Sequence, residues 1–137
     1  MEKTLLEKGQ LISAPIGISM LPLIRPNRDV VVLKNNLDPQ KYDVVLYKRA
    51  NGKYILHRIL DVLPDSYVLC GDNQWVKEYG IKREQILAVM EGFYRDDKYI
   101  SREIKSYRLY VKVWCLSLTC RRMILLVNNM INKIRRL

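Results

Sequence analysis

Three short segments hold side chains that could do chemistry together. Ser19 lies in a turn-like stretch ahead of a proline, His57 interrupts an apolar stretch, and Asp72 belongs to a Gly-Asp-Asn turn. A serine hydroxyl attacks a carbonyl only when a base takes its proton, and histidine is the base whose pKa lies nearest neutrality. An acid on the other imidazole nitrogen fixes the tautomer and stabilises the imidazolium. These residue types point to nucleophilic acyl transfer, with Ser19 as nucleophile, His57 as general base and Asp72 as the acid that orients it.

Each of these residues also has a structural explanation when it is taken alone. A serine in a loop is common, a lone histidine in a strand is more often a hydrogen-bonded core residue, and Gly-Asp-Asn is a common turn. Metal chemistry has less support, because the chain holds one histidine and three cysteines, Cys70, Cys115 and Cys120, without a Cys-x-x-Cys spacing. This set predicts neither a metal centre nor a disulfide framework, and we expect no metal or cofactor.

The elements that must position these residues are short strands. Segments rich in β-branched residues are separated by turn signals such as Asn51-Gly52 and Pro64-Asp65-Ser66. The expected strands cover residues 29–33, 43–47, 54–60, 62–63, 67–70 and 86–90. Their length and spacing predict one mainly β domain of the α+β class over residues 1–104.

Residues 105–137 differ from the preceding part in charge. The whole chain has 24 Lys and Arg against 14 Asp and Glu, which gives a net charge of +10. Eight of the basic residues and none of the acids lie from Lys105 onward, so the preceding part is nearly neutral. This distribution indicates that the C-terminal segment faces an anionic partner, either phospholipid headgroups or nucleic acid.

The same segment carries an apolar stripe. Apolar residues recur at alternating four- and three-residue steps, which predicts a basic amphipathic helix. The stripe consists of Leu109, Val113, Leu116, Cys120, Met123, Val127, Met130, Ile134 and Leu137. A helix is the expected structure from Met123 onward, whereas residues 107–118 are rich in β-branched and aromatic residues and are also open to a strand interpretation.

Three environments are open for this helix. It could dock on the domain, lie in an anionic membrane interface with Tyr110 and Trp114 at headgroup level, or contact nucleic acid, which is the weakest of the three. No stretch reaches the ~18 apolar residues that cross a bilayer as one helix. Residues 1–8 also lack the apolar stretch of a signal peptide. We therefore expect a protein of the cytoplasm or of a membrane surface.

The order and wording of the segments resemble the signal peptidase I and LexA-like serine peptidase superfamily. Those proteins carry a Gly-x-Ser-Met-x-Pro box, then a strand pair of the type Gly-Asp-Val-Val…His/Lys-Arg, and then a Gly-Asp-Asn box. The corresponding segments here are residues 17–22, 42–46 with 55–59, and 67–73. The resemblance spans residues 10 to 95 and implies a small, coiled antiparallel β-sheet peptidase domain followed by the C-terminal amphipathic helix.

The resemblance also implies roles for individual residues. Ser19 matches the nucleophile, and His57 falls where the endoplasmic-reticulum-type branch has its histidine base. Asp72 matches the acid that supports the base in that branch, and Glu78 lies near the place of a second acid. Gly17 stands where some bacterial members have a hydroxyl residue of the oxyanion hole, which leaves the backbone N–H of Ser19 as the expected donor.

The chain also departs from the pattern of these families. Typical signal peptidases have a membrane helix just upstream of the serine box, and LexA-type relatives have an N-terminal DNA-binding domain. Few residues precede Ile12, so we expect neither in this chain. The basic tail is a candidate replacement for the anchor.

The resulting hypothesis is a serine endopeptidase that cleaves a precursor, leader or signal peptide. We expect the substrate to pair as an extended peptide with a strand edge near the site. Activity is expected to rise through roughly pH 6 to 7, where an unperturbed histidine titrates. The alternatives are a non-catalytic peptide-binding or membrane-docking module that keeps the fold, and a nucleic-acid binder that uses the basic tail.

Overall fold

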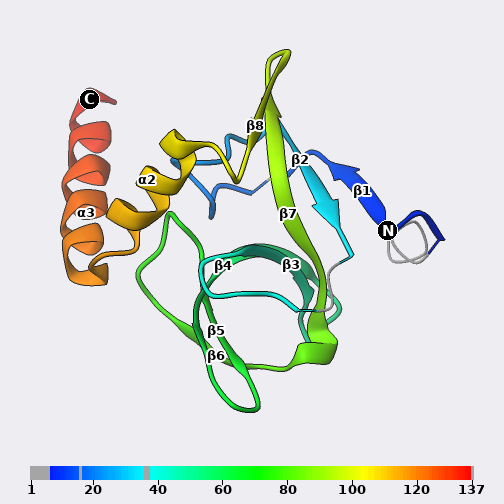
Figure 1. Ribbon diagram of the computed structural model, residues 1–137. Coiled ribbons are helices and arrows are strands. Elements are labelled where there is room, and N and C mark those ends of the chain that lie inside the picture. Colours follow the sequence, from blue (N-terminus) through cyan, green and yellow to red (C-terminus); the bar gives the residue numbers. More distant parts are fainter. Residues whose placement is uncertain (1–6, 16, 36–37, 137) are drawn as a thin grey trace.

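The computed structural model describes residues 7–15, 17–35 and 38–136. In these ranges eight strands form one antiparallel sheet, and two helices follow it along the chain (Figure 1). The strands are β1 (Gln10–Ser13), β2 (Asp29–Lys34), β3 (Val44–Lys48), β4 (Tyr54–Val62), β5 (Tyr67–Cys70), β6 (Glu78–Ile81), β7 (Ile86–Arg95) and β8 (Lys98–Ser101). A 3-10 turn, η1 (Arg83–Gln85), precedes β7, and the helices are α2 (Lys105–Trp114) and α3 (Leu118–Arg135).

The long strand β7 joins two parts of the sheet. The strand order is β1-β2-β7-β3-β4-β5-β6, and β8 pairs with β7 outside this path. One buried cluster gathers side chains from β2, β3, β7, α2 and the loop after β1. A second buried cluster gathers side chains from β3 to β7. Strands β2, β3, β5 and β7 are therefore buried on both faces over much of their length.

The hairpin of β3 and β4 sets the orientation of the predicted base. Gly52 has φ +87°, which favours glycine in the tight turn, and Arg49 N–H donates to the Lys53 carbonyl across it. The resulting register pairs Val45 with His57. Successive side chains of a strand point to opposite faces, so His57 shares its face with β3 residues 45 and 47, and Arg58 points to the other face.

The strands expected from the sequence are confirmed, and with them the α+β class with a mainly antiparallel sheet. Of the segment expected at 62–63, Val62 is the last residue of β4 and Leu63 lies outside the strand, and β7 extends five residues beyond its expected end. Three observed strands, β1, β6 and β8, have no counterpart in the prediction. Each has four residues and lies at a margin of the sheet, and four residues are too few to show an alternating pattern.

The C-terminal segment forms two helices. Residues 105–114 are helical, so the strand interpretation of this part was wrong. The helical structure is interrupted at residues 115–117. There the Ser117 side chain caps α3 by accepting a hydrogen bond from the Cys120 N–H at 3.3 Å. Neither described helix is long and apolar enough to cross a membrane.

The predicted apolar stripe faces solvent. Its described members are exposed, among them Leu109 of α2 at 62 %, Leu116 between the helices at 83 % and Ile134 of α3 at 63 %. The helices touch the domain through other residues, among which Tyr107, Arg121 and Leu125 are buried. The prediction of an amphipathic segment therefore stands, but the stripe is not the face that docks on the domain.

Candidate functional site

Two of the predicted segments are bonded directly to each other. The loop after β5 donates twice to the serine loop, from the Asn73 N–H to the Ser19 carbonyl at 2.8 Å and from Asn73 Nδ2 to the Ile18 carbonyl at 3.1 Å. The Asp72 N–H points to Met20 Sδ at 3.5 Å. The Gly-Asp-Asn turn thus holds the serine loop by its backbone.

The predicted base lies at the same junction. A Cβ built on Gly71 would stand 2.5 Å from the Ser19 carbonyl oxygen and 3.1 Å from His57 Nε2. Side-chain atoms do not approach a backbone oxygen so closely, and only glycine lets the three segments meet here. His57 Nε2 and the Ser19 carbonyl oxygen therefore both lie beside Gly71.

The other imidazole nitrogen belongs to a buried polar network. His57 Nδ1 lies 3.2 Å from the Tyr47 hydroxyl, which also lies 3.0 Å from both carboxylate oxygens of Glu78. Arg49 forms an ion pair with Glu78 at 2.8 Å. The network therefore runs from the imidazole through a phenol to an ion pair.

The Tyr47 network fixes the tautomer of His57. Burial and the charge of Glu78 raise the pKa of Tyr47, so its hydroxyl keeps its proton. The hydroxyl has a single proton, which the Glu78 carboxylate accepts, and its oxygen is left to accept from His57 Nδ1–H. We therefore assign the proton of the neutral ring to Nδ1. Nε2 then carries the free lone pair that a general base requires.

The surroundings also hold the imidazole neutral. His57 is buried, and burial together with the charge of Arg49 lowers its pKa from 6.5 to about 4. The charges of Glu78 and Asp72 act in the opposite direction, but burial outweighs them. The expectation that an unperturbed histidine would titrate near pH 6 to 7 is therefore corrected to a lower pH.

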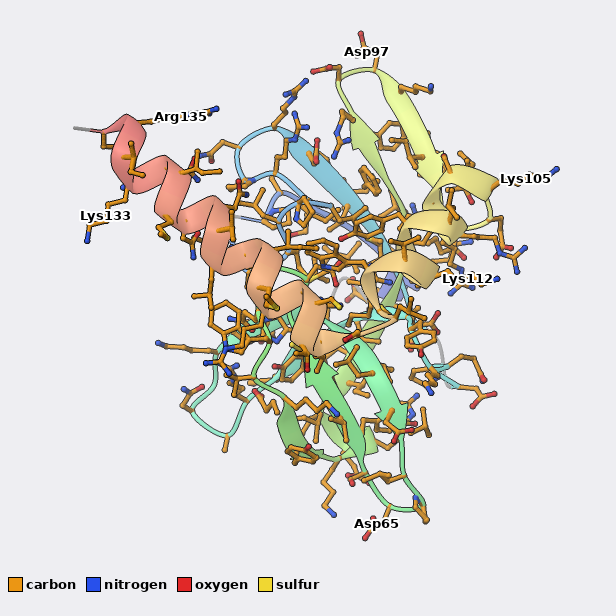
Figure 2. All side chains as sticks on the ribbon, turned by 90° about the vertical axis from the view of Figure 1, so that its left-hand side faces the viewer. Asp65, Asp97, Lys105, Lys112, Lys133 and Arg135 are labelled. Atoms are coloured by element: carbon orange, nitrogen blue, oxygen red, sulfur yellow. The ribbon has the colours of Figure 1, made fainter. Side chains whose placement is uncertain are left out.

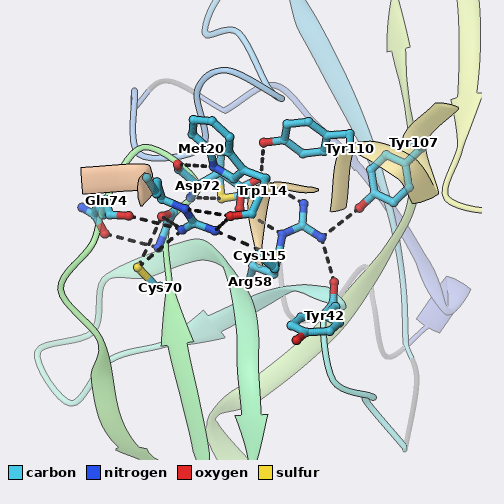
Figure 3. Close-up of polar contacts among 12 residues, drawn as sticks. Met20, Tyr42, Arg58, Cys70, Asp72, Gln74, Tyr107, Tyr110, Trp114 and Cys115 are labelled. Carbon is cyan, nitrogen blue, oxygen red and sulfur yellow. Dashed lines mark hydrogen bonds and ion pairs between the residues drawn. The ribbon is translucent and has the colours of Figure 1, made fainter. Parts of the chain in front are cut away.

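The predicted acid Asp72 is engaged elsewhere (Figure 3). Its carboxylate forms a two-pronged ion pair with Arg58, with both contacts at 2.9 Å, and accepts from the Tyr110 hydroxyl at 2.7 Å. Both partners of the ion pair are fully buried. Among the residues that the structure describes, Asp72 makes no hydrogen bond to His57. Because His57 and Arg58 are neighbours on one strand, an acid bound to Arg58 lies on the opposite face from the imidazole.

The two C-terminal helices bind the loop after β5. From α2, Trp114 Nε1 donates to the Asp72 carbonyl at 2.7 Å. From α3, the buried guanidinium of Arg121 donates to the carbonyls of Gly71 at 3.3 Å and Gln74 at 3.2 Å, and to the Trp114 carbonyl at 2.9 Å. Figure 3 shows these contacts gathered around the loop. The helices thus fix the segment that holds the serine loop.

Ser19 and His57 open into different cavities. Ser19 lines a mostly apolar cavity of about 350 Å³ between β1, β2 and the β3–β4 hairpin. His57 lines a cavity of about 470 Å³ beside the loop after β5. Within the described residues no hydrogen bond joins Ser19 Oγ to His57. The predicted residues are thus brought to one junction, but the nucleophile–base contact is not formed. In active sites such contacts commonly tighten only in the complex with substrate.

The described ranges hold no cluster of side chains suited to metal binding or to cysteine chemistry. No group of three His, Cys, Asp or Glu side chains there could hold a metal ion. The three cysteines are free thiols, and burial raises the pKa of Cys70 to about 11. That thiol stays protonated and is a poor nucleophile.

Sequence reasoning missed Tyr47 and left the role of Glu78 open. The observed hairpin has a three-residue turn, residues 50–52, which pairs Val45 with His57 and so places Tyr47 on the same face as His57. The two-residue turn that an Asn-Gly pair suggests would instead pair residue 46 with residue 57, so the turn signal alone did not reveal Tyr47. The position of Glu78 at the start of the edge strand β6 gave no comparable signal.

Comparisons of the chain with models of protein families, with curated proteins and with solved structures gave no match.

Proposed function

We propose that the protein is a serine endopeptidase in which Ser19 is the nucleophile and His57 the general base. The observation that carries the proposal is the junction at Gly71, where His57 Nε2 and the serine loop approach one point. The neutral, Nδ1-protonated imidazole supports it, because this is the form that takes a proton from a hydroxyl. The peptidase type is that of the signal peptidase and LexA superfamily, in its histidine-base branch.

The reaction follows from these positions. Ser19 Oγ bonds to the scissile carbonyl carbon while His57 Nε2 takes its proton, and the backbone N–H of Ser19 faces the resulting oxyanion. The C–N bond breaks as His57 returns the proton to the leaving amine. A water then attacks the acyl-serine through the same base, which frees the new carboxyl group and restores the hydroxyl. Tyr47 and Glu78 stabilise the imidazolium through Nδ1, the role that the sequence assigned to Asp72.

The substrate in this proposal is an extended stretch of a precursor, leader or signal peptide. The described edge strand β1 pairs only with β2, so its other side offers backbone donors and acceptors to a peptide. The cavity at Ser19 is lined mainly by apolar side chains and fits an apolar residue of the peptide. No cofactor takes part in the proposed reaction.

A peptide library tests the proposal across many candidate substrates at once. The full chain is incubated with peptides from a digested proteome, and mass spectrometry identifies new termini. We expect cleavage by the wild type, a loss of at least about 10³-fold in Ser19→Ala and His57→Ala, and no loss in the control Ser106→Ala, an exposed serine on α2. Identical spectra for wild type and Ser19→Ala would refute proteolysis by this site.

The second candidate is a non-catalytic peptide-binding module of the same fold. The absence of a hydrogen bond between Ser19 Oγ and His57 in the described structure favours it, as does the opening of the two side chains into different cavities. A peptide captured equally well by wild type and Ser19→Ala, without cleavage, supports the module over the enzyme.

A further inference from the structure

Helix α3 has two opposite faces, and the apolar one points away from the domain. Arg121 and Leu125 are buried against the domain, and Asn128 and Asn132 continue the same face at helical spacing. The opposite face carries the stripe from Met123 to Ile134. A helix that docks on its own domain normally buries its apolar face, so this arrangement is inverted.

The exposed apolar face is extensive. Seven large apolar side chains of α3 are between 43 % and 64 % exposed. They are Met123, Ile124, Leu126, Val127, Met130, Ile131 and Ile134. Figure 2 shows α3 lying along the outside of the molecule. Contiguous apolar surfaces of this kind mark interaction sites in soluble domains.

The charges around this face have one sign. Residues 105–136 contain no acid, and Arg122, Lys133, Arg135 and Arg136 on α3 are all exposed. Figure 2 shows Lys133 and Arg135 near the C-terminal end of the helix. A second copy of this chain placed on the stripe would bring like charges together. A bilayer with anionic headgroups supplies both the apolar depth and the opposite charge.

We propose that α3 binds the surface of an anionic phospholipid bilayer. The helix lies parallel to the membrane plane with Met123, Val127, Met130 and Ile134 in the acyl boundary and its basic side chains among the phosphates. With about 1.5 Å per residue, the helix covers roughly 27 Å of membrane surface. Arg121 of α3 is hydrogen-bonded to the loop after β5. Binding of α3 to the membrane would therefore bring the candidate site close to the membrane surface.

Vesicle flotation with the full chain tests this proposal. Vesicles of phosphatidylcholine with roughly 30 % phosphatidylglycerol are compared with vesicles of phosphatidylcholine alone, since anionic lipid attracts each basic side chain near the surface. We expect the protein to float with the anionic vesicles and to be released as the salt concentration rises, because headgroup attraction is screened. Flotation needs no catalysis, so its result is independent of the proposed hydrolysis.

Paired variants distinguish vesicle binding by the apolar stripe from non-specific vesicle binding by any exposed apolar side chain. Val127→Gln/Met130→Gln removes two exposed apolar side chains of α3 and should lower vesicle affinity at least about tenfold. The control Val62→Gln/Val76→Gln removes two exposed valines of the β domain and should leave affinity unchanged. Circular dichroism confirms that all variants keep their helices.

Three results would overturn the proposal. The first is the absence of anionic-vesicle binding by wild type, and the second is equal binding by the α3 variant. The third is a stable dimer in light scattering that Val127→Gln/Met130→Gln dissociates, because the stripe would then be covered by a second copy of the chain.

Discussion

The Tyr47 hydroxyl lies between the His57 imidazole and the Glu78 carboxylate, and it has a single proton to donate. Since Glu78 takes that proton, the phenol oxygen holds the Nδ1–H of His57 and leaves the free lone pair on Nε2. A phenol therefore takes the position that a carboxylate has in a Ser–His–Asp triad. The negative charge reaches the imidazole through one intervening hydroxyl.

Replacing Tyr47 by phenylalanine tests this orientation. Tyr47→Phe should lower kcat of the peptidase by about 10- to 100-fold with little change in KM, because the imidazole loses its acceptor and its tautomer is no longer fixed. The control Tyr107→Phe removes another buried hydroxyl, which accepts from Arg58 at 3.3 Å, and should leave kcat unchanged. Equal effects of the two variants would show that Tyr47 acts only through stability.

The pKa of His57 predicts the acid side of the activity profile. With a pKa of about 4, the base is unprotonated from roughly pH 6 upward, so kcat/KM should be level there and fall toward pH 4. A profile measured on a cleaved peptide from pH 3.5 to 8 checks this. A midpoint between pH 6 and 7 would mean that His57 is more hydrated in solution than its buried position implies, or that another group is the base.

Asp72 is expected to act on stability rather than on the base. Asp72→Asn leaves Arg58 buried without its counter-charge, which should cost about 3–5 kcal/mol of unfolding free energy. Asp29→Asn is the matched control, because that buried carboxylate pairs with Arg95 and neither residue belongs to the candidate site. Both variants should retain kcat per folded molecule. A loss of about 10⁴-fold in folded Asp72→Asn alone would return Asp72 to the role of orienting acid.

At the scale of elements, the loop after β5 depends on the C-terminal helices. Arg121→Met keeps the length and apolar stem of the side chain but removes one donor from each of three backbone carbonyls, those of Gly71, Gln74 and Trp114. We expect a loss of about 3 kcal/mol or more in unfolding free energy and faster amide exchange at Asn73. Arg122→Met, the exposed neighbour whose guanidinium lies over the Trp75 ring, should change stability by about 0.5 kcal/mol or less. Chemical denaturation of both variants measures the difference.

The strand pattern and the segments of the candidate site could be predicted from the sequence. The contacts that these segments make with one another could not. The interior strands β2, β3, β4, β5 and β7 were predictable, because β-branched residues and turn signals delimit them. The meeting of Ser19, His57 and Gly71 depends on contacts between distant segments, for which the spacing of the boxes gave only a resemblance. The pairing of Asp72 with Arg58 was not foreseen, although alternation along β4 already separates Arg58 from the base.

The C-terminal stripe shows a different limit of sequence reasoning. Its helical period was read correctly over α3, but periodicity does not tell which face meets the domain. A buried arginine and two tyrosines decide that question here through hydrogen bonds to Asp72, Arg58 and the loop carbonyls. These polar contacts outweigh the usual preference for apolar docking and leave the stripe outside.

At the scale of the whole molecule, stability should depend on pH through the single histidine. The unfolded chain binds a proton at His57 near pH 6.5, whereas the folded protein resists it down to about pH 4. The unfolded state therefore holds more protons in this window, and unfolding free energy falls by up to about 3 kcal/mol as the pH drops from 6.5 to 4. Urea unfolding at several pH values measures this loss. The difference between wild type and His57→Gln isolates the histidine, and parallel curves for the two proteins would contradict it.

The bonds between Arg121 and the loop after β5 also have a consequence for biosynthesis. The ribosome delivers residues 19, 57 and 71 early, but the Gly71 and Gln74 carbonyls of that loop receive the hydrogen bonds of Arg121 only after residue 121 has emerged. Until then the nascent polypeptide holds every group of the candidate site without the brace that arranges them. In the proposed peptidase, competence would thus come only with completion of α3.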